Sequence, residues 1–429
     1  MILAGEKPKD LKHYMTRCAD TLKTILDAEL CVGCGLCESI AGSDSLRMEI
    51  TSAGQIRPVQ HSDIPSLDEQ LIISVCPGTS VTAHDQTTPY EDPVWGPTFR
   101  IAKGFANDQT IRHTGASGGV LTAIADYLLQ RGEAEFVLHV ANSVESPLIA
   151  EPQYSSTRSE LLKAAGSWYT PVAPLKEIHS LLDQGRRFII IAKPCDIAAM
   201  RNLASRDNRV DELVPFMFSF FCGGVAAQHA NDQIVAHHGL STSNVRSIRH
   251  RGLGCPGPTR VTSNDGQIFD ISYKQAWNGD LTLNMQFRCK ICPDGVGELA
   301  DITVGDIIEP SILRESGQHS VTAGYDAIIA RTEHGLALLR DLEEGGVISL
   351  SPITFEDLNR CQPHQVRRKQ ALLPILLAMH LVWKFVPVFS GFGLFRNACR
   401  LGLTSALRTF LSMCSRLRQK QHLWRLGDY

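Results

Sequence analysis

Several features that would assign a sequence to a simple class are missing here. The 429 residues contain no internal repeat and no low-complexity tract, which excludes solenoids and collagen-like chains. Residues 1–12 are polar and mixed in charge, so we expect no secretory signal. The net charge of −3, with 20% charged and 43% hydrophobic residues, is typical of a soluble globular protein. The length suffices for two or three domains.

Acidic residues are almost absent from the C-terminal part. From residue 360 to the end there are twelve Lys and Arg residues and one acid, Asp428, so this tail carries +11 and the body before it −14. Residues 371–395 are strongly apolar, and residues 397–425 place arginines among leucines. This pattern favours a helical tail that lies on a membrane surface. Two alternatives stay open: a docking arm, and a membrane span that Pro374, Lys384 and Pro387 weaken.

Thirteen cysteines are many for a chain without an expected signal peptide. Disulfides are therefore not expected, and metal or redox use in a reducing, cytoplasmic compartment is favoured. The segment Cys31-Val-Gly-Cys34-Gly-Leu-Cys37 and the later Cys76-Pro77 match the four thiolates that a cubane iron–sulfur cluster needs. The alternatives are a zinc site and a set of unliganded thiols, although zinc ribbons usually pair two separated C-x-x-C knuckles.

A second set of cysteines follows predicted elements of an α/β domain. The apolar strands 187–192 and 213–221 end at Cys195 and Cys222, and ligands bind at this edge of open α/β sheets. A C-x-x-C knuckle then supplies Cys289 and Cys292, which brings the set to four, as a second cubane requires. The alternative is two unrelated buried cysteines beside a small knuckle.

A glycine-rich turn opens the predicted helix 114–129. Three glycines and two hydroxyls at a helix start can cradle an anion such as a phosphate, because free N–H groups and the helix dipole point at it. The alternative is a capped helix that packs closely on a strand. The residues of this turn are Thr114, Gly115, Ala116, Ser117, Gly118 and Gly119.

The remaining pattern predicts an α/β fold, α+β over the whole chain. A ferredoxin-like iron–sulfur segment spans residues 1–85, a linker spans 86–97, an α/β domain spans 99–359, and the helical tail spans 360–429. We expect a hairpin of strands 46–50 and 55–59 and a second hairpin turning at residues 265–266. Further predicted elements are strands 135–140, 300–306 and 327–330 and helices 174–184 and 336–342.

Taken in order, these motifs resemble the coenzyme F420 hydrogenase/dehydrogenase beta subunit family, together with 7-hydroxymethyl chlorophyll a reductase and ferredoxin-dependent divinyl chlorophyllide 8-vinyl reductase. The resemblance covers roughly residues 30–350 and leaves the tail outside. It rests on the two cysteine sets and the turn above, and on three further segments, Lys193-Pro-Cys195-Asp, Phe221-Cys222-Gly-Gly and Ala300-Asp-Ile-Thr-Val-Gly305-Asp306.

The resemblance implies FAD in the central domain, with the turn from Thr114 to Gly119 against the flavin and its phosphates. It also implies two [4Fe-4S] clusters, an outer one on Cys31, Cys34, Cys37 and Cys76 and an inner one on Cys195, Cys222, Cys289 and Cys292. Cys255 stands where an aromatic residue is expected before Pro-Gly, so it either lines the active site or competes as a ligand.

The implied function is an FAD-dependent iron–sulfur oxidoreductase. Ferredoxin or a partner subunit supplies single electrons, and the flavin passes electron pairs to a small molecule such as F420 or a tetrapyrrole. His113, His250 and Asp306 are candidate proton donors, each with a structural alternative. Alternative functions are a non-catalytic electron-transfer subunit and a membrane-anchored, zinc-stabilised interaction protein. We expect no nucleic-acid partner and a cytoplasmic location, peripheral on the inner membrane face if the tail binds lipid.

Overall fold

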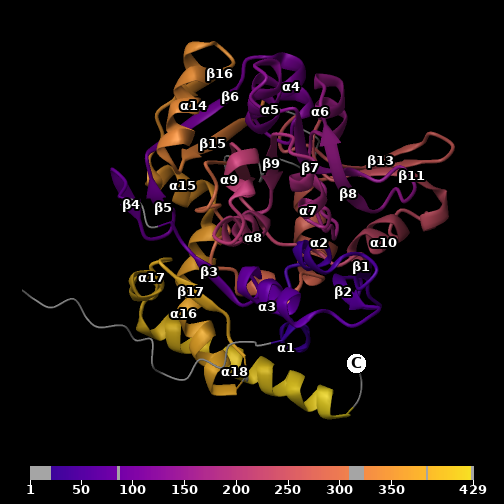
Figure 1. The fold of residues 1–429 in the computed structure, drawn as a ribbon, viewed down its shortest axis with the longest axis vertical. Helices are drawn as coiled ribbons and strands as arrows, with labels where there is room; N and C mark the ends of the chain where they lie inside the picture. The colour runs from indigo at the N-terminus through magenta and orange to yellow at the C-terminus, as the bar shows by residue number, and fades with distance from the viewer. Residues whose placement is uncertain (1–20, 85–86, 309–322, 383–384, 427–429) are drawn as a thin grey trace, which may run out of the picture.

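A computed structural model describes residues 21–84, 87–308, 323–382 and 385–426. The N-terminal segment 1–12, Lys384 and Asp428, on which parts of the sequence analysis rest, lie outside these ranges. Figure 1 shows a body built on one large sheet, with the C-terminal helices gathered at the opposite end of the molecule.

An eight-stranded mixed sheet organises the body, in the order β16-β6-β15-β14-β10-β9-β7-β8. Its four central strands β7, β9, β10 and β14 are mutually parallel, while β8, β15 and β16 run antiparallel to their neighbours. This confirms the predicted α/β class. The strands are β6 (Arg100–Ala106), β7 (Phe136–Asn142), β8 (Ala150–Ser155), β9 (Phe188–Ala192), β10 (Met217–Phe220), β14 (Ile302–Ile307), β15 (Tyr325–Ala330) and β16 (Ile348–Ser351).

The sheet is apolar on both faces because helices cover both. On strand β9, Phe188 and Ile190 join one buried cluster with Ile197 of α8, while Ile189 joins another with Ile124 of α5. Alternate residues of a strand point to opposite faces, so a run of apolar residues is required here. The covering helices are α5 (Val120–Gln130), α6 (Arg158–Ala164) and α14 (Glu333–Glu344) on one face and α7 (Ile178–Asp183), α8 (Pro194–Ala204) and α9 (Arg209–Leu213) on the other.

Three predicted boundaries were wrong. The strand expected over 213–221 is only β10, because α9 ends at Leu213 and Pro215 cannot donate a ladder hydrogen bond. The expected linker contains the short antiparallel strands β4 (Tyr90–Asp92) and β5 (Gly96–Thr98), joined by a turn in which Asp92 accepts two backbone N–H bonds. The helix expected over 114–129 is split, because α4 (Gln109–Thr114) ends where the turn begins and α5 starts at Val120.

The N-terminal segment forms a layer beside the body. It contains the predicted hairpin, in which Ile50 pairs with Ile56 and Gly54 takes the left-handed conformation, with φ of +68°. Its elements are α1 (Leu22–Asp27), α2 (Leu36–Ala41), β1 (Leu46–Ile50), β2 (Ile56–Gln60), α3 (Ser66–Val75) and β3 (Ser80–Thr82).

A small antiparallel sheet, β11-β12-β13, flanks the edge of the body and contains the second predicted hairpin. It lies near α10 (Figure 1). The elements of this region are α10 (His229–Ala236), the 3-10 helix η1 (Thr242–Asn244), β11 (Val245–Arg249), β12 (Thr259–Ser263), β13 (Ile268–Ile271), α11 (Tyr273–Ala276), the π-helical turn η2 (Trp277–Leu281) and α12 (Phe287–Lys290).

The tail is helical, as predicted, and it packs against the N-terminal segment. Leu372, Met379 and Leu417 of the tail share a buried cluster with Ile25 and Leu30. Among the residues that the structure describes, none of the helices has the length and apolarity needed to cross a membrane. The elements are α15 (Phe355–Cys361), α16 (Pro363–Val382), β17 (Val388–Ser390), which pairs with β3, α17 (Leu394–Leu401) and α18 (Leu403–Leu426).

Candidate functional site

The structure draws the four N-terminal cysteines, here called the outer set, into one neighbourhood. Cys31 and Cys34 are buried in the loop before α2, Cys37 lies in α2, and Cys76 directly follows α3. Burial, with a smaller contribution from the nearby Cys31, raises the pKa of Cys76 to about 12. Burial also raises the pKa of Cys37 well above its ordinary value, and all three of the other thiols add to that rise.

Two glycines allow the loop of the outer set to pack tightly. Gly33 and Gly35 have φ of +77° and +90°, a region that favours glycine. A Cβ on Gly35 would lie 2.9 Å from the Cβ of Ala173, so a side chain there would push the loop off the body. Backbone N–H groups also reach two thiols, from Gly33 to Cys31 Sγ (3.4 Å) and from Gly78 to Cys76 Sγ (3.3 Å).

The other four predicted ligands, here called the inner set, come together at the C-terminal ends of strands β9 and β10. Cys195 begins α8 after β9, Cys222 follows β10, and Cys289 and Cys292 come from α12 and the loop after it. Burial, with smaller contributions from Cys289 and Cys292, raises the pKa of Cys222 to about 12. Burial raises the pKa of Cys195 well above its ordinary value, with contributions from Cys222 and Cys292. Two strands of the same direction thus deliver cysteines to one place.

The inner set also has N–H donors. The backbone N–H of Val225 and the side-chain amide of Gln286 both donate to Cys289 Sγ, at 3.3 Å. Such N–H···S bonds stabilise thiolates and tune iron–sulfur clusters.

One arginine connects the two sets. Arg288 precedes Cys289 in the chain, is 2% exposed, and donates from Nη2 to the carbonyl oxygen of Pro77 (2.9 Å), the residue after Cys76. Its charge lowers the pKa of both Cys76 and Cys292 against the larger opposing effect of burial. The guanidinium therefore stabilises thiolate charge on both sides.

A largely buried ion pair lies beside Cys195 of the inner set. Lys193 Nζ is 2.7 Å from Asp196 Oδ2, and these residues flank Cys195. Lys193 lowers the pKa of Cys195, whereas Asp196 raises the pKa of Cys195 and of Cys34 in the outer set. Because one carboxylate acts on both thiols, the two sets lie close together.

These groups fit a cubane cluster at each set. Within the described ranges, no group of three or more His, Cys, Asp and Glu residues could hold a single metal ion. A cubane binds its four thiolates through four separate irons, so that finding does not test it. Neighbouring thiols raise the pKa of Cys37 in the outer set and of Cys222 in the inner set, in addition to the larger effect of burial. A cationic core is needed before all four cysteines of a set can be thiolates, and an iron–sulfur core would supply it.

Helix α16 of the tail closes the inner set. Arg368 donates to the carbonyl oxygens of Cys222 (3.0 Å) and Gly223 (2.6 Å), and Gln365 also donates to Cys222 (3.1 Å). Lys369 donates to the carbonyl of Pro293, beside Cys292, at 2.8 Å. The tail therefore contributes cations and hydrogen bonds to a site built by the body.

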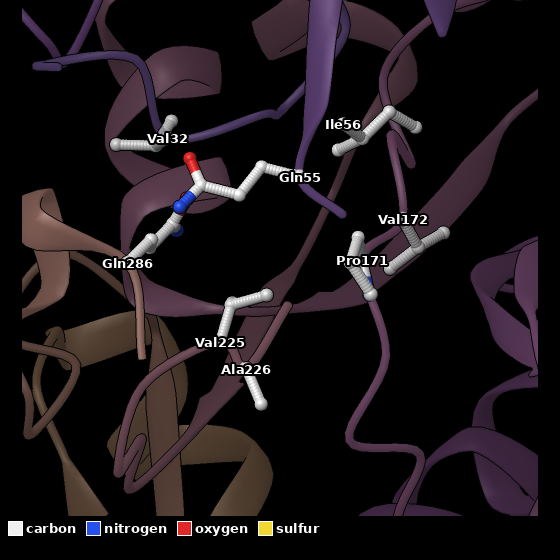
Figure 2. Close-up of a pocket in the computed structure, with 8 residues that line it drawn as sticks. All are labelled: Val32, Gln55, Ile56, Pro171, Val172, Val225, Ala226 and Gln286. Atoms are coloured by element: carbon white, nitrogen blue, oxygen red, sulfur yellow. The ribbon is translucent and has the colours of Figure 1, made fainter. Parts of the chain in front are cut away.

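A narrow crevice, too tight to admit a water molecule, lies where the loop of the outer set meets the body (Figure 2). Val32, between two outer cysteines, and Val225 and Gln286, which donate to Cys289, form part of its wall. In Figure 2, Gln55 and Gln286 extend toward each other across it. The full lining is Val32, Gln55, Ile56, Pro171, Val172, Val225, Ala226 and Gln286.

The turn from Thr114 to Gly119 favours the alternative of a capped helix. Val120 N at the start of α5 donates to Asp326 Oδ2 (3.1 Å), and the backbone N–H of Gly118 also bonds to this carboxyl group. Burial raises the pKa of Asp326 to about 7. A side chain of the protein thus already bonds to two of the N–H groups that a phosphate at this helix start could use. Binding of FAD at this turn stays a prediction.

A buried polar cluster lies beside the same turn. Arg251 forms an ion pair with Asp306, a predicted proton donor, and donates to the carbonyl oxygens of Ala116 (2.6 Å) and Pro256 (2.8 Å). Cys255 Sγ lies 3.9 Å from Ser117 Oγ. Cys255 therefore lines the cluster around the turn, beside Arg251 and Asp306.

Aromatic rings join this cluster to the inner set. A Cβ on Gly223 would lie 2.7 Å from Trp277, so the residue after Cys222 must be small. The Trp277 ring contacts the rings of Tyr169 and Tyr273, with centroids 4.8 Å and 6.4 Å away, and Arg251 lies 5.0 Å from the Tyr273 ring. The inner set and the turn thus share one continuous region.

The two predicted histidines have different environments. His113 is exposed at the end of α4, and its backbone carbonyl accepts a bond from Gly254. His250 is fully buried, its Nε2 lies 2.8 Å from Asn231 Oδ1, and its Nδ1 accepts from the N–H of Tyr169. Burial lowers the pKa of His250 to about 3. Both ring nitrogens have protein partners, which favours the structural alternative for this residue.

Sequence reasoning missed the charged residues around the sulfurs. Lys193 and Arg288 each stand close to a predicted ligand in the sequence, and that adjacency was an available signal. Arg368 and Asp326 carried no such signal, because they come from a distant helix and from strand β15.

Comparison with known proteins extends these observations. Residues 101–179 match the profile "Coenzyme F420 hydrogenase/dehydrogenase, beta subunit N-term", and residues 185–356 match the corresponding C terminus. The coenzyme F420 hydrogenase subunit beta of Methanococcus voltae is 27% identical over 261 residues, which are 58% of this chain and 82% of the relative. The coenzyme F420-dependent sulfite reductase of Methanocaldococcus jannaschii is 22% identical over 81% of this chain and 50% of its own length.

A solved structure has the same fold. A chain of the F420-reducing [NiFe] hydrogenase complex from Methanosarcina barkeri, in a xenon derivative, superposes with a TM-score of 0.52 at 20% identity, covering 70% of this chain and 98% of that one. The relatives are named as oxidoreductases or their subunits, which supports oxidoreductase activity. The two profiles cover more than half of the sequence in the expected order, and the chain therefore belongs to the coenzyme F420 hydrogenase/dehydrogenase beta subunit family.

Proposed function

We propose that this protein is an iron–sulfur oxidoreductase that carries electrons between a redox partner and a small-molecule acceptor through two [4Fe-4S] clusters. The observation that carries the proposal is the pair of adjoining four-cysteine sets. Arg288, next to Cys289 of the inner set, donates a hydrogen bond to Pro77, next to Cys76 of the outer set. Bound clusters supply one-electron transfer.

The residues around each set have the roles that such clusters need. N–H groups of Gly33, Gly78 and Val225 donate to sulfurs and orient them. Arg288 and Arg368 offset the negative charge of buried thiolates, and a favourable local charge raises the affinity for an added electron.

FAD and its acceptor form a second part of the proposal. The resemblance implies FAD, but the N–H donors of the turn from Gly118 to Val120 already bind Asp326, so we assign no phosphate site there. The region of Trp277, Tyr273 and Cys255 adjoins the inner set and is where we expect the acceptor side of the protein. Coenzyme F420, named in the relatives, is the first acceptor to test.

The decisive measurement is iron, sulfide and flavin per chain on anaerobically purified protein. We expect about eight irons from two four-cysteine sets, and one FAD. Cys37→Ser and Cys289→Ser should each remove about four irons, and Cys255→Ser is the matched control that should keep all of them. About four irons in the wild-type protein, or zinc in place of iron, would overturn the proposal.

A second candidate is a non-catalytic electron-transfer subunit that acts only within a larger complex. The solved relative belongs to a hydrogenase complex, and the Methanococcus voltae relative is a subunit, which favours partner subunits here too. If the protein, once reduced by ferredoxin, reoxidises on addition of F420 with no partner subunit present, the result supports the first candidate, an enzyme. Reoxidation only in the presence of a partner protein supports the subunit.

A further inference from the structure

The C-terminal layer carries large apolar side chains that are exposed to solvent. Leu403 is 85% exposed, Phe395 74% and Leu381 67%, although core leucines such as Leu372 are almost fully buried on the same layer. The complete set, here called the leucine surface, is Leu377, Leu381, Phe395, Leu403, Leu407 and Leu411.

Helical spacing groups these residues. Leu403, Leu407 and Leu411 follow one another at intervals of four on α18, and Leu377 and Leu381 do so on α16. Helices α16 and α18 pack against each other, and Figure 1 shows them together at one end of the molecule. The side of α18 that faces the body is occupied by Met413 and Leu417, which belong to the core shared with the outer set. The leucine surface is thus additional to what folding requires.

The charges that the tail itself contributes next to the leucine surface have one sign. No Asp or Glu occurs from residue 358 to 427, whereas Arg408, Arg416 and Arg418 are exposed on α18. Arg396 and Arg400 of α17 pair with Glu91 and Asp92, which anchors this layer to the body. The body itself carries a net negative charge, so an anionic surface would attract only this end of the molecule.

We propose that the leucine surface and the arginines beside it bind the face of an anionic lipid bilayer, with α16 and α18 lying in the interface. Exposed leucines and phenylalanine beside arginines are the composition of interfacial helices. Anionic headgroups attract such basic segments. The inference goes beyond the proposed function and does not rest on it.

A second copy of the chain fits this surface less well than lipid. A two-fold contact would place the same basic surface of both copies face to face, where arginines repel. The surface also lies beyond residue 356, where the match to the family profiles ends.

The test is sedimentation of the full-length, anaerobically purified protein with vesicles. Vesicles of phosphatidylcholine with roughly a quarter phosphatidylglycerol should bind it at least about tenfold more tightly than phosphatidylcholine alone, and high salt should weaken the binding. Replacing Leu403, Leu407 and Leu411 by aspartate should reduce binding about tenfold or more. The matched control is Leu67→Asp with Leu283→Asp, because both leucines are 78% exposed and lie outside the tail.

A charge-reversal set separates lipid from protein partners. Glutamate at Arg408, Arg416 and Arg418 should abolish the preference for anionic vesicles, whereas the same change at exposed arginines of the body should not. These controls are Arg131, Arg187 and Arg246. Unchanged iron content and circular dichroism show that each variant is folded. Absence of binding to anionic vesicles, equal binding by the leucine variant, or a leucine-dependent dimer in place of lipid binding would each overturn the proposal.

Discussion

The ion pair between Lys369 and Glu298 is the sharpest test of how the tail is attached. The two side chains are 4% and 2% exposed, and Lys369 Nζ also donates to the carbonyl of Pro293. Lys369→Met would leave Glu298 as a buried charge without its main partner. Removing one member of a buried pair costs about 3–5 kcal/mol. Arg331 still acts on Glu298, so we expect about 3 kcal/mol.

This cost should appear as local opening of α16, because Lys369 holds that helix to the loop of Cys292. A loss of about 3 kcal/mol corresponds to a roughly 100-fold larger population of the locally open state, and the amides of α16 should exchange faster by the same factor. Hydrogen exchange of α16 amides, measured by mass spectrometry on the anaerobic protein, reports it directly. Glu298→Gln combined with Lys369→Met should restore most of the protection, because no charge is then left unpaired.

The control is the same substitution at an exposed pair. Lys23 Nζ lies 2.6 Å from Asp27, with side chains 81% and 52% exposed, so Lys23→Met should change stability by less than about 1 kcal/mol. Burial raises the pKa of Glu298, and Lys369 opposes this rise. Without Lys369, protonation relieves the buried charge, so the defect should be smaller at low pH and grow as the pH rises through the raised pKa. Protection of α16 within about threefold of wild type in Lys369→Met would refute this reasoning.

Three further outcomes are expected. Arg368→Gln removes a cation that lowers the pKa of Cys222. The reduction potential of one cluster, followed by electron paramagnetic resonance, should therefore fall by on the order of 60 mV. An unchanged potential would contradict this role of Arg368. Burial raises the pKa of Asp326 to about 7, so wild-type stability should decline as the pH rises from about 4 to 7; urea titrations of Asp326→Asn should lack that slope. Gly35→Ala should lose about four irons, because its Cβ would meet a neighbour at 2.9 Å, whereas Gly42→Ala, with φ of +81° and open space, should retain them.

Local patterns explain which parts of the fold were predictable. Strand β9 must be apolar at every position because helices cover both faces, and that run is visible in the sequence. The hairpin from Leu46 to Gln60 was predicted because alternation and a glycine turn act within a few residues. The strand before Cys222 was placed wrongly at its start because Val214 and Phe216 are buried although they lie outside it.

Contacts between distant segments explain what was missed. Arg288 reaches Pro77 across 211 residues, and Asp326 of β15 caps α5 from 206 residues away. Neither pairing follows from spacing, since each depends on how whole elements dock. The basic charge and apolar character of the tail are visible in the sequence. Neither property predicts that Arg368 of the tail contacts the inner set.

The sequence by itself determined the family, the α/β class and the eight cysteines that stand as candidate ligands, because motif order and hydrophobic periodicity are local properties. Only the tertiary structure decided that the two sets adjoin, that Asp326 caps the helix after the glycine turn, and that α16 closes the inner set. The physical reason is that burial and charge act through space. A buried thiol, carboxylate or guanidinium acquires its properties from neighbours that folding brings to it from elsewhere in the chain.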